Sequence, residues 1–171
     1  MPNALQRQII FDRIGYKPNP AQSKIHQSKA RQILVTGGEQ SGKSTIGANE
    51  LTCRCPEGKL FWLVGAEYDA TKVEFNYTCE NLSKLEIPFS ATKRVDPGEI
   101  DAGIFRIVTK SARDPQKLMA EAPDGILGCE AAQLDYESYL RIRGRIAPKR
   151  GWMILTGTLE GSLGWYPELF N

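Results

Sequence analysis

The sequence predicts an α/β fold in which helices cover both faces of a mainly parallel β-sheet. Short apolar runs alternate along the chain with segments whose apolar residues recur at helical spacing, the pattern of parallel strands joined by helices. A chain of 171 residues is long enough for one domain of ordinary size and too short for two. Hydrophobic residues make up 41% and charged residues 25% of the chain, as in globular rather than disordered proteins.

Charge, hydropathy and cysteine content exclude several classes of protein. With 22 Lys and Arg against 20 Asp and Glu, the net charge is only +2, so binding to nucleic acid must depend on a local basic patch. No apolar run approaches the roughly 20 residues of a membrane span, and the N-terminus lacks the apolar core of a secretory signal. Four cysteines are too few for a disulfide scaffold and indicate a reducing, intracellular setting.

The N-terminal third is expected to hold two short helices, a strand and a third helix. Apolar residues spaced among polar ones favour a helix over 1–13, and a short polar helix is expected over 22–31. Between them, the segment 16–22 is expected to be a turn, because two prolines and an Asn do not continue a helix. The apolar run 33–36 ends in glycines and suits a buried strand, which a helix follows through about Thr52.

The rest of the chain is expected to add four strands and two helices to the same sheet. The spacing of Val73, Tyr77 and Leu82 favours a helix over 70–85. A second helix is expected over 136–146 despite Gly144. The apolar runs that predict strands are 59–65, 104–109, 125–129 and 152–158.

A phosphate-binding loop is predicted between the strand 33–36 and the helix after it. Its glycines let the backbone turn around a phosphate with N–H groups pointing inward, and the following helix directs its positive end at the same anion. Lys43 would neutralise the β- and γ-phosphates, and the Ser44 hydroxyl would coordinate Mg²⁺. The alternative is a glycine-rich turn without a ligand. The residues that match the G-x-x-x-x-G-K-[ST] pattern are Gly37, Gly38, Glu39, Gln40, Ser41, Gly42, Lys43 and Ser44, with Thr45 next to them.

Glu130 is the candidate catalytic carboxylate. It follows the strand predicted at 125–129 and is therefore expected at the sheet edge that also carries the phosphate loop. There it could orient a water molecule for attack, although an ordinary surface acid at a strand end is the alternative. The usual arrangement places an Asp before this Glu to hold Mg²⁺. Here that residue is Cys129, and since a neutral thiol is a poor ligand for a hard cation, we expect a weakened metal site.

Taken together, five segments resemble the ATPase domain of the large terminase subunit of tailed bacteriophages, the motor that packages DNA into a procapsid. They occur in the family's order and extend along nearly the whole chain. The resemblance implies a RecA-like P-loop NTPase fold over a single domain, residues 1–171. The segments are YKPNPAQSKIH (16–26), GGEQSGKST (37–45), LFWLVGAEYDATK (60–72), KSARDPQKLMAEAPDGILGCEAA (110–132) and GWMILTGT (151–158).

The resemblance also implies roles for individual residues. ATP and Mg²⁺ are the expected ligands, with Lys43 and Glu130 as the catalytic residues. Tyr16 and Gln22 match the segment that helps to hold the adenine, and the Gln side chain offers both the donor and the acceptor that the edge of adenine needs. Thr156 and Thr158 match the Ser/Thr-rich end of the coupling strand, which senses the γ-phosphate.

The partners that the resemblance implies are double-stranded DNA, further copies of the chain in a ring, the portal and the small terminase subunit. The expected location is the host cytoplasm, transiently at the portal of the procapsid, with no role for a membrane. The segment 141–150 holds five basic residues in ten and is a candidate contact to the DNA backbone or to a neighbouring subunit. A solvated helix face is its alternative explanation.

Departures from the family's pattern predict reduced activity. Cys129 replaces the metal-site Asp, and Met119 lies where many members have an Arg that acts across subunits. Glu39 and Gln40 stand where basic residues are frequent. The chain ends at Asn171, so we expect the family's nuclease domain to be absent and the ATPase domain to be shortened.

Three other functions fit parts of the pattern. A nucleotide-binding module with little or no turnover is the main alternative, and Cys129 and Met119 favour it. A small-molecule P-loop kinase is less well supported, because such enzymes usually begin with the phosphate-loop strand and about 30 residues precede it here. A helicase would need a second motor domain, which this length does not accommodate.

Overall fold

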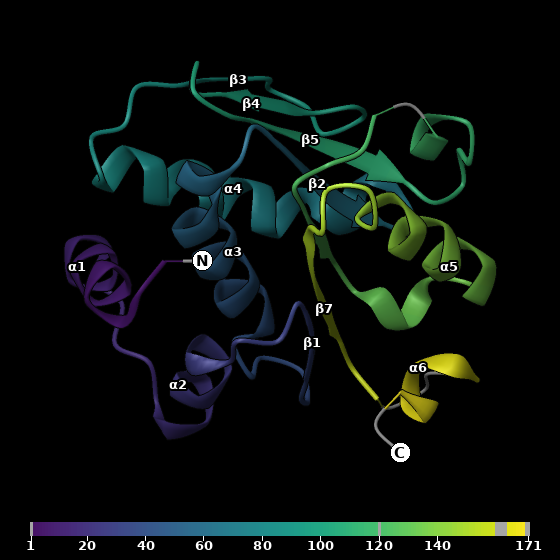
Figure 1. The fold of residues 1–171 in the computed structure, drawn as a ribbon, viewed down its shortest axis with the longest axis horizontal. Helices are drawn as coiled ribbons and strands as arrows, with labels where there is room; N and C mark the ends of the chain where they lie inside the picture. Colours follow the sequence, from purple (N-terminus) through teal and green to yellow (C-terminus); the bar gives the residue numbers. More distant parts are fainter. Residues whose placement is uncertain (1, 120, 160–163, 170–171) are drawn as a thin grey trace.

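A seven-stranded sheet with helices on both faces forms the domain, in a computed structural model that describes residues 2–119, 121–159 and 164–169 (Figure 1). The strand order is β1-β7-β6-β2-β5-β4-β3, and the five strands from β1 to β5 in this order run parallel. The mainly parallel sheet predicted from the sequence is confirmed. These five strands are β1 (Gln32–Thr36), β7 (Trp152–Gly157), β6 (Gly125–Gly128), β2 (Leu60–Gly65) and β5 (Arg106–Ser111).

The helices occur where apolar spacing predicts them, with shifted ends. No helix in the described ranges is long and apolar enough to cross a membrane. Four short 3₁₀ helices fill connections: η1 (Cys55–Glu57), η2 (Tyr68–Thr71), η3 (Lys117–Met119) and η4 (Ala131–Gln133). The α-helices are α1 (Ala4–Ile14), α2 (Pro20–Gln27), α3 (Lys43–Arg54), α4 (Lys72–Lys84), α5 (Tyr136–Arg145) and α6 (Trp165–Glu168).

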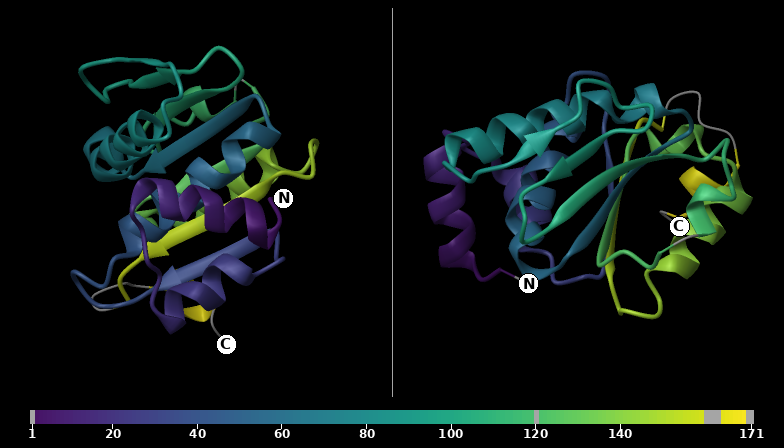
Figure 2. Two further views of the ribbon diagram at one scale, coloured as in Figure 1. Left: turned by 90° about the vertical axis from the view of Figure 1, so that its left-hand side faces the viewer. Right: turned by 90° about the horizontal axis from the view of Figure 1, so that it is seen from above.

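The core consists of two apolar layers, one on each face of the sheet. Successive side chains of a strand point to opposite faces, so β2 contributes to both layers. Phe61 and Leu63 pack with α3 and α4, whereas Trp62 packs with α5 and α6 on the other face. The right-hand view of Figure 2 shows the sheet between these two helical layers. Both faces are covered, as a parallel sheet requires.

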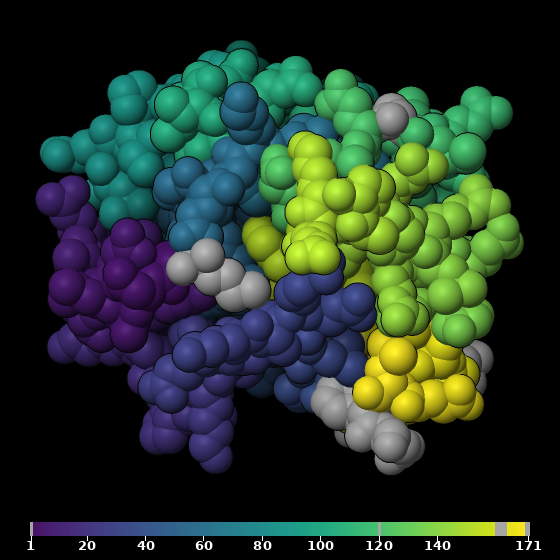
Figure 3. All heavy atoms as spheres, in the orientation of Figure 1, coloured from purple at the N-terminus to yellow at the C-terminus, as the bar shows by residue number. Residues whose placement is uncertain are grey.

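The N-terminal helices lie against α3 and α4, and Figure 3 shows their residues, in purple, at the opposite side of the molecule from α6. The prediction of a turn over 16–22 is wrong in part, because α2 begins at Pro20. Proline suits the first helical position, where its missing N–H has no partner in any case. Asn19 caps the helix and Gln22 completes the capping box. The helix then ends at Gln27, four residues earlier than expected.

An antiparallel hairpin extends one edge of the sheet and was not predicted. β4 (Glu99–Asp101) pairs antiparallel with β5, and β3 (Ser90–Ala91) pairs with β4. Both strands are short, and the side chains of β3 are exposed, so no hydrophobic alternation marks them in the sequence. The hairpin lies at the far end of the strand order from β1 and hence away from the predicted phosphate loop.

Candidate functional site

One cleft joins most of the predicted site residues at the carboxyl ends of the parallel strands. Its volume is about 830 Å³. The phosphate loop follows β1, Thr158 follows β7 and Glu130 follows β6, and these three strands are neighbours in the sheet. Ligands bind α/β sheets at this edge. The residues that line the cleft are Glu39, Gln40, Ser41, Gly42, Lys43, Ser44, Thr45, Val73, Tyr77, Glu130, Gln133 and Thr158.

The phosphate loop is a tight turn that only particular residues can form. Gly42 precedes the first residue of α3 with φ of 81°, a left-handed conformation that glycine adopts without strain. Gln40 has φ of 58°, which is uncommon for a residue with a side chain. A Cβ atom on Gly37 would lie 2.5 Å from Ser41 Oγ, so no larger residue fits there. The loop therefore curves back on itself at the positive end of α3.

The Lys43 ammonium group lies within this curve. The side chain is only 7% exposed, and Nζ donates hydrogen bonds to the carbonyl oxygens of Gly37 at 3.0 Å and Gly38 at 2.7 Å. A flexible, half-open lysine would point into solvent instead. The fold thus concentrates a positive charge and the N-terminus of α3 at one point, an arrangement that attracts phosphate.

Glu130 lies across the cleft with an unusual backbone. Its φ is 46° and ψ is 48°, a left-handed conformation at the junction of β6 and η4. Such strain in a residue with a side chain occurs most often at functional sites. Its charge is also felt by buried Tyr166 of α6, because burial and then the Glu130 carboxylate raise the pKa of that phenol. The strained turn aims this carboxylate at the edge where the phosphate loop lies.

The two threonines predicted to couple hydrolysis to motion differ in position. Thr158 lies just beyond β7 and lines the cleft. Thr156 lies within β7, is buried, and donates from Oγ1 to the carbonyl oxygen of Gly128 at 3.1 Å. This bond ties β7 to β6, so Thr156 is placed to hold the two strands in register and Thr158 to face a ligand.

The two residues predicted to contact adenine are likewise separated. Gln22 Nε2 lies 3.1 Å from the position of a Cβ on Gly42, so the Gln22 amide packs against the phosphate loop. Its Oε1 accepts the backbone N–H of Asn19. Tyr16 instead packs between Phe11 and His26, and its hydroxyl lies 3.0 Å from His26 Nε2. Burial, followed by the charge of Glu50, raises the pKa of Tyr16 to about 12.

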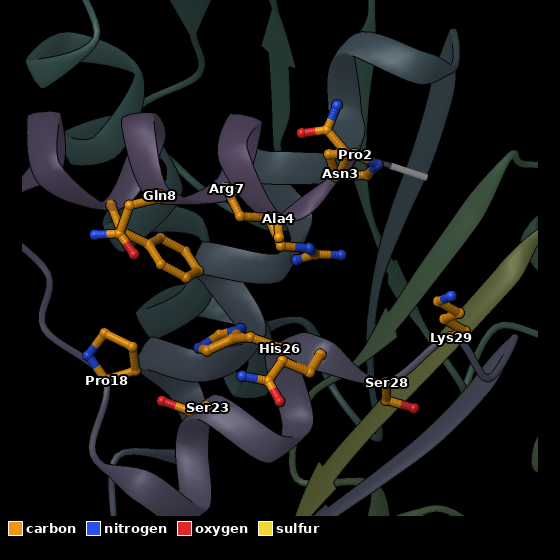
Figure 4. Close-up of a pocket in the computed structure, with 12 residues that line it drawn as sticks. Pro2, Asn3, Ala4, Arg7, Gln8, Pro18, Ser23, His26, Ser28 and Lys29 are labelled. Atoms are coloured by element: carbon orange, nitrogen blue, oxygen red, sulfur yellow. The ribbon is translucent and has the colours of Figure 1, made fainter.

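A second cavity, of about 710 Å³, lies between α1 and α2 (Figure 4). Arg7 and His26 reach it from these two helices, and both bind the same buried carboxylate, Glu50 of α3. His26 Nδ1 lies 2.7 Å from Glu50 Oε1, and Arg54 Nε lies 2.7 Å from Glu50 Oε2. Burial favours the neutral form of Glu50. The hydrogen bond with His26 and the charges of Arg54 and Arg7 nevertheless hold its pKa below the usual value.

Glu74 is a buried acid that the sequence analysis did not single out. It lies in the first turn of α4 and is 2% exposed. Its carboxylate makes hydrogen bonds with the Ser44 hydroxyl and the Cys129 thiol, and Glu130 is close enough to act on it electrostatically. Burial is the largest influence and raises the pKa of Glu74. The sequence offered only helical spacing at this point, and Val73 and Tyr77 of that pattern prove to be exposed and to line the cleft.

Sequence comparison finds two curated relatives of this chain. The large terminase subunit of Thermus virus P23-45 is 27% identical over 182 residues, and that of Thermus phage G20c is 26% identical. Each match covers 94% of this chain and 37% of the relative, so the chain spans 37% of the length of either protein. No family model matches the sequence.

Solved structures give the fold a family. The ATPase domain of the Thermus phage P74-26 large terminase superposes with a TM-score of 0.73 at 24% identity, over 94% of this chain and 72% of that one. The chain has the fold of the phage large terminase ATPase domain. The large terminase of a thermophilic bacteriophage, solved in complex with ADP, has a TM-score of 0.59 at 12% identity and is covered over 91% of this chain and 39% of that one.

Compared with the terminase pattern, the metal site rests on few residues. Cys129 is fully buried, and burial raises the pKa of its thiol well above the usual value, so it stays neutral and is no ligand for a hard cation. Within the described ranges, no group of three or more His, Cys, Asp or Glu could hold a metal ion. The half-buried Ser44 hydroxyl at the start of α3 fits Mg²⁺ in the way common at phosphate sites, where few protein ligands join phosphate oxygens and water.

The position of the terminase trans-acting Arg holds no cation here. Met119 ends η3, is 58% exposed and lines a shallow pocket with Leu140, Arg141 and Arg145 of α5. Arg113 lies nearer to Glu130, along a depression that both line, and pairs with Glu67 at 2.8 Å.

Proposed function

We propose that this chain is the ATPase domain of a phage large terminase subunit, and that it couples hydrolysis of ATP with Mg²⁺ to movement of double-stranded DNA into the procapsid. The observation that carries the proposal is the single cleft in which the phosphate loop faces Glu130 and Thr158. The relationship to two large terminases supports the assignment.

The phosphate loop and Lys43 would bind and orient the triphosphate. Backbone N–H groups at the start of α3 meet the phosphate oxygens, and Lys43 neutralises charge on the β- and γ-phosphates once its contacts to Gly37 and Gly38 are exchanged for contacts to oxygen anions. Ser44 would hold Mg²⁺. The chemistry that this ion supplies when bound is to bridge phosphate oxygens and to neutralise the charge that develops during transfer.

Glu130 would orient the attacking water for in-line displacement and accept its proton. Its strained turn fixes the carboxylate on the opposite side of the cleft from Lys43. Thr158, beside them, would respond to loss of the γ-phosphate, and the Thr156 bond to Gly128 would pass that change along β7 and β6.

Gln22 is our proposed partner for the adenine edge, because its amide already lies beside the phosphate loop. Tyr16, whose hydroxyl is bonded to His26, would offer adenine only its ring.

The proposed partners are those of a packaging motor: double-stranded DNA, copies of the chain in a ring, the portal and the small terminase subunit, met in the host cytoplasm and at the procapsid portal. Arg143 is exposed on α5, within the basic segment 141–150, and is the first candidate for contact with DNA phosphates or a neighbouring subunit.

Hydrolysis and binding, measured separately, test the assignment. The purified chain is expected to hydrolyse ATP, and Glu130→Gln to slow hydrolysis by a factor of about 10² or more while it still binds nucleotide, because the loss affects only general-base action. Glu137→Gln on the exposed surface of α5 is the matched control and should hydrolyse at the wild-type rate. Wild-type hydrolysis by Glu130→Gln would remove this carboxylate from the mechanism.

Cys129 favours a second candidate, a nucleotide-binding module with little turnover, because a neutral thiol replaces the metal-site acid. Cys129→Asp distinguishes the two. A large gain in hydrolysis would indicate an ATPase held back at this position, whereas unchanged, negligible hydrolysis with intact binding would favour the module.

A further inference from the structure

Glu74 brings a carboxylate to the place where the phosphate loop meets the end of β6. The helix that carries it, α4, packs along α3, and its residues Val73 and Tyr77 line the cleft on either side of Glu74. Glu74 itself lies behind the cleft wall, against the Ser44 side chain on α3 and Cys129 after β6. Two separate elements of the proposed magnesium site thus meet at one buried carboxylate.

The surroundings of Glu74 do not satisfy its charge. Within the described part of the chain it forms no ion pair, although carboxylates are almost never this buried unless they are paired. The first turn of α4 favours an acid electrostatically, but that effect is modest and is equally available to an exposed side chain. A cation on the far side of Ser44 would supply what the fold omits.

We propose that Glu74 is a positioning residue for magnesium: it accepts the hydrogen bond of the Ser44 hydroxyl, turns the lone pairs of Ser44 Oγ toward the cleft, and provides the negative charge that Cys129 does not. This inference rests on the proposed function, since it needs a nucleotide and Mg²⁺ at the phosphate loop. The acid before Glu130 has been lost from the strand and its charge is supplied from α4.

The chemistry of the hydroxyl makes the geometry effective. Ser44 has one hydrogen and two lone pairs, and an ionised carboxylate can only accept. When the hydrogen points back to Glu74, both lone pairs remain for ligation on the cleft side. Partners that orient a metal ligand in this way change metal affinity by about 10- to 100-fold when they are removed.

The experiment measures how nucleotide affinity depends on Mg²⁺. A fluorescent ATP analogue is titrated into the wild type, Glu74→Gln and the matched control Glu80→Gln, which makes the same change at an exposed position of α4. Each titration is repeated in EDTA and at rising Mg²⁺ concentration. We expect Glu74→Gln to raise the Mg²⁺ concentration for half-maximal tightening by about 10-fold or more. Its affinity in EDTA should match the wild type, and Glu80→Gln should be unchanged in both conditions.

Two double variants test whether Glu74 acts through Ser44 and replaces the missing acid. Ser44→Ala should raise the Mg²⁺ requirement by itself, and adding Glu74→Gln should then change little, because the carboxylate has no hydroxyl left to orient. Cys129→Asp should restore much of the Mg²⁺ dependence in the Glu74→Gln background.

Three outcomes separate the possibilities. If Glu74→Gln weakens binding equally in EDTA and in Mg²⁺, or if its effect adds fully to that of Ser44→Ala, its role is structural and the inference is overturned. An unchanged Mg²⁺ requirement in a folded Glu74→Gln variant overturns the inference alone. A wild type that binds no nucleotide under any condition overturns the proposed function and the inference with it.

Discussion

Two buried glutamates on neighbouring helices have opposite environments. Glu50 of α3 is fully buried among three basic side chains, and its pKa is lowered despite burial. Glu74 of α4 is almost as buried, has a hydroxyl and a thiol for partners, and its pKa is raised by burial. The fold completes the charge balance of Glu50 and leaves that of Glu74 open.

The contrast separates a structural acid from a functional one. The Glu50 cluster joins α1, α2 and α3 through Arg7, His26 and Arg54, and it fixes the N-terminal helices on the domain. Glu74 joins no such set, although it faces the proposed nucleotide site. A group kept buried at a cost to stability, where the rest of the core is well packed, indicates selection for function.

The largest expected effect is from Glu50→Gln. This variant leaves three basic side chains around a neutral amide, and breaking a buried charge cluster in this way costs about 3–5 kcal/mol. Urea unfolding of the variant and the wild type measures the loss. A loss below about 1 kcal/mol, no larger than that of the exposed Glu137→Gln control, would show that the cluster does not hold the N-terminal helices.

The pH dependence of stability gives the next largest effect. The pKa of Glu50 is lowered by folding, so its contribution is complete above the ordinary value of 4.5 and is lost as pH falls below it toward the folded-state pKa. The difference in unfolding free energy between wild type and Glu50→Gln should therefore be constant from pH 7 to about 5 and shrink at lower pH. A difference that grows on acidification would contradict the assigned ionic state.

Tyr16→Phe should cost about 1 kcal/mol, since it removes one part-buried hydrogen bond to His26 at the edge of the Glu50 cluster. Thermal unfolding measures the change. Nucleotide affinity is expected to stay at the wild-type value because the ring remains, and a large loss of affinity would mean that the hydroxyl contacts the nucleotide.

The smallest effect on stability is expected from Glu74→Gln without nucleotide or metal. Folding raises the pKa of Glu74, which means that the fold disfavours its charged form at pH 7, so removing the charge should leave stability within about 1 kcal/mol of the wild type or increase it. Urea unfolding in EDTA measures this. A loss as large as that of Glu50→Gln would make the two glutamates alike and end the comparison.

Much of the fold and of the site could be predicted because the signals are local. The phosphate loop shows a contiguous pattern, and the five parallel strands are continuous apolar runs buried on both faces. Glu130 could be placed because it directly follows one of those strands. Each of these features depends on residues next to one another in the chain.

The features that were missed depend on tertiary contacts or on short elements. The hairpin of β3 and β4 has too few residues to show alternation. Thr156 and Thr158 match the coupling pattern equally well, and only the end of β7 between them decides which one reaches the cleft. Glu74 acquires its role from the packing of α4 on α3, which no pattern within 70–85 encodes.

Calorimetric titration of ATP with Mg²⁺ into the wild type and Lys43→Ala tests the central claim most directly. The account predicts one site per chain for the wild type and no detectable binding by a folded Lys43→Ala variant, because the loop loses the charge that it holds against Gly37 and Gly38. Equal affinity in both proteins would contradict the account, since the nucleotide would then bind somewhere other than this loop.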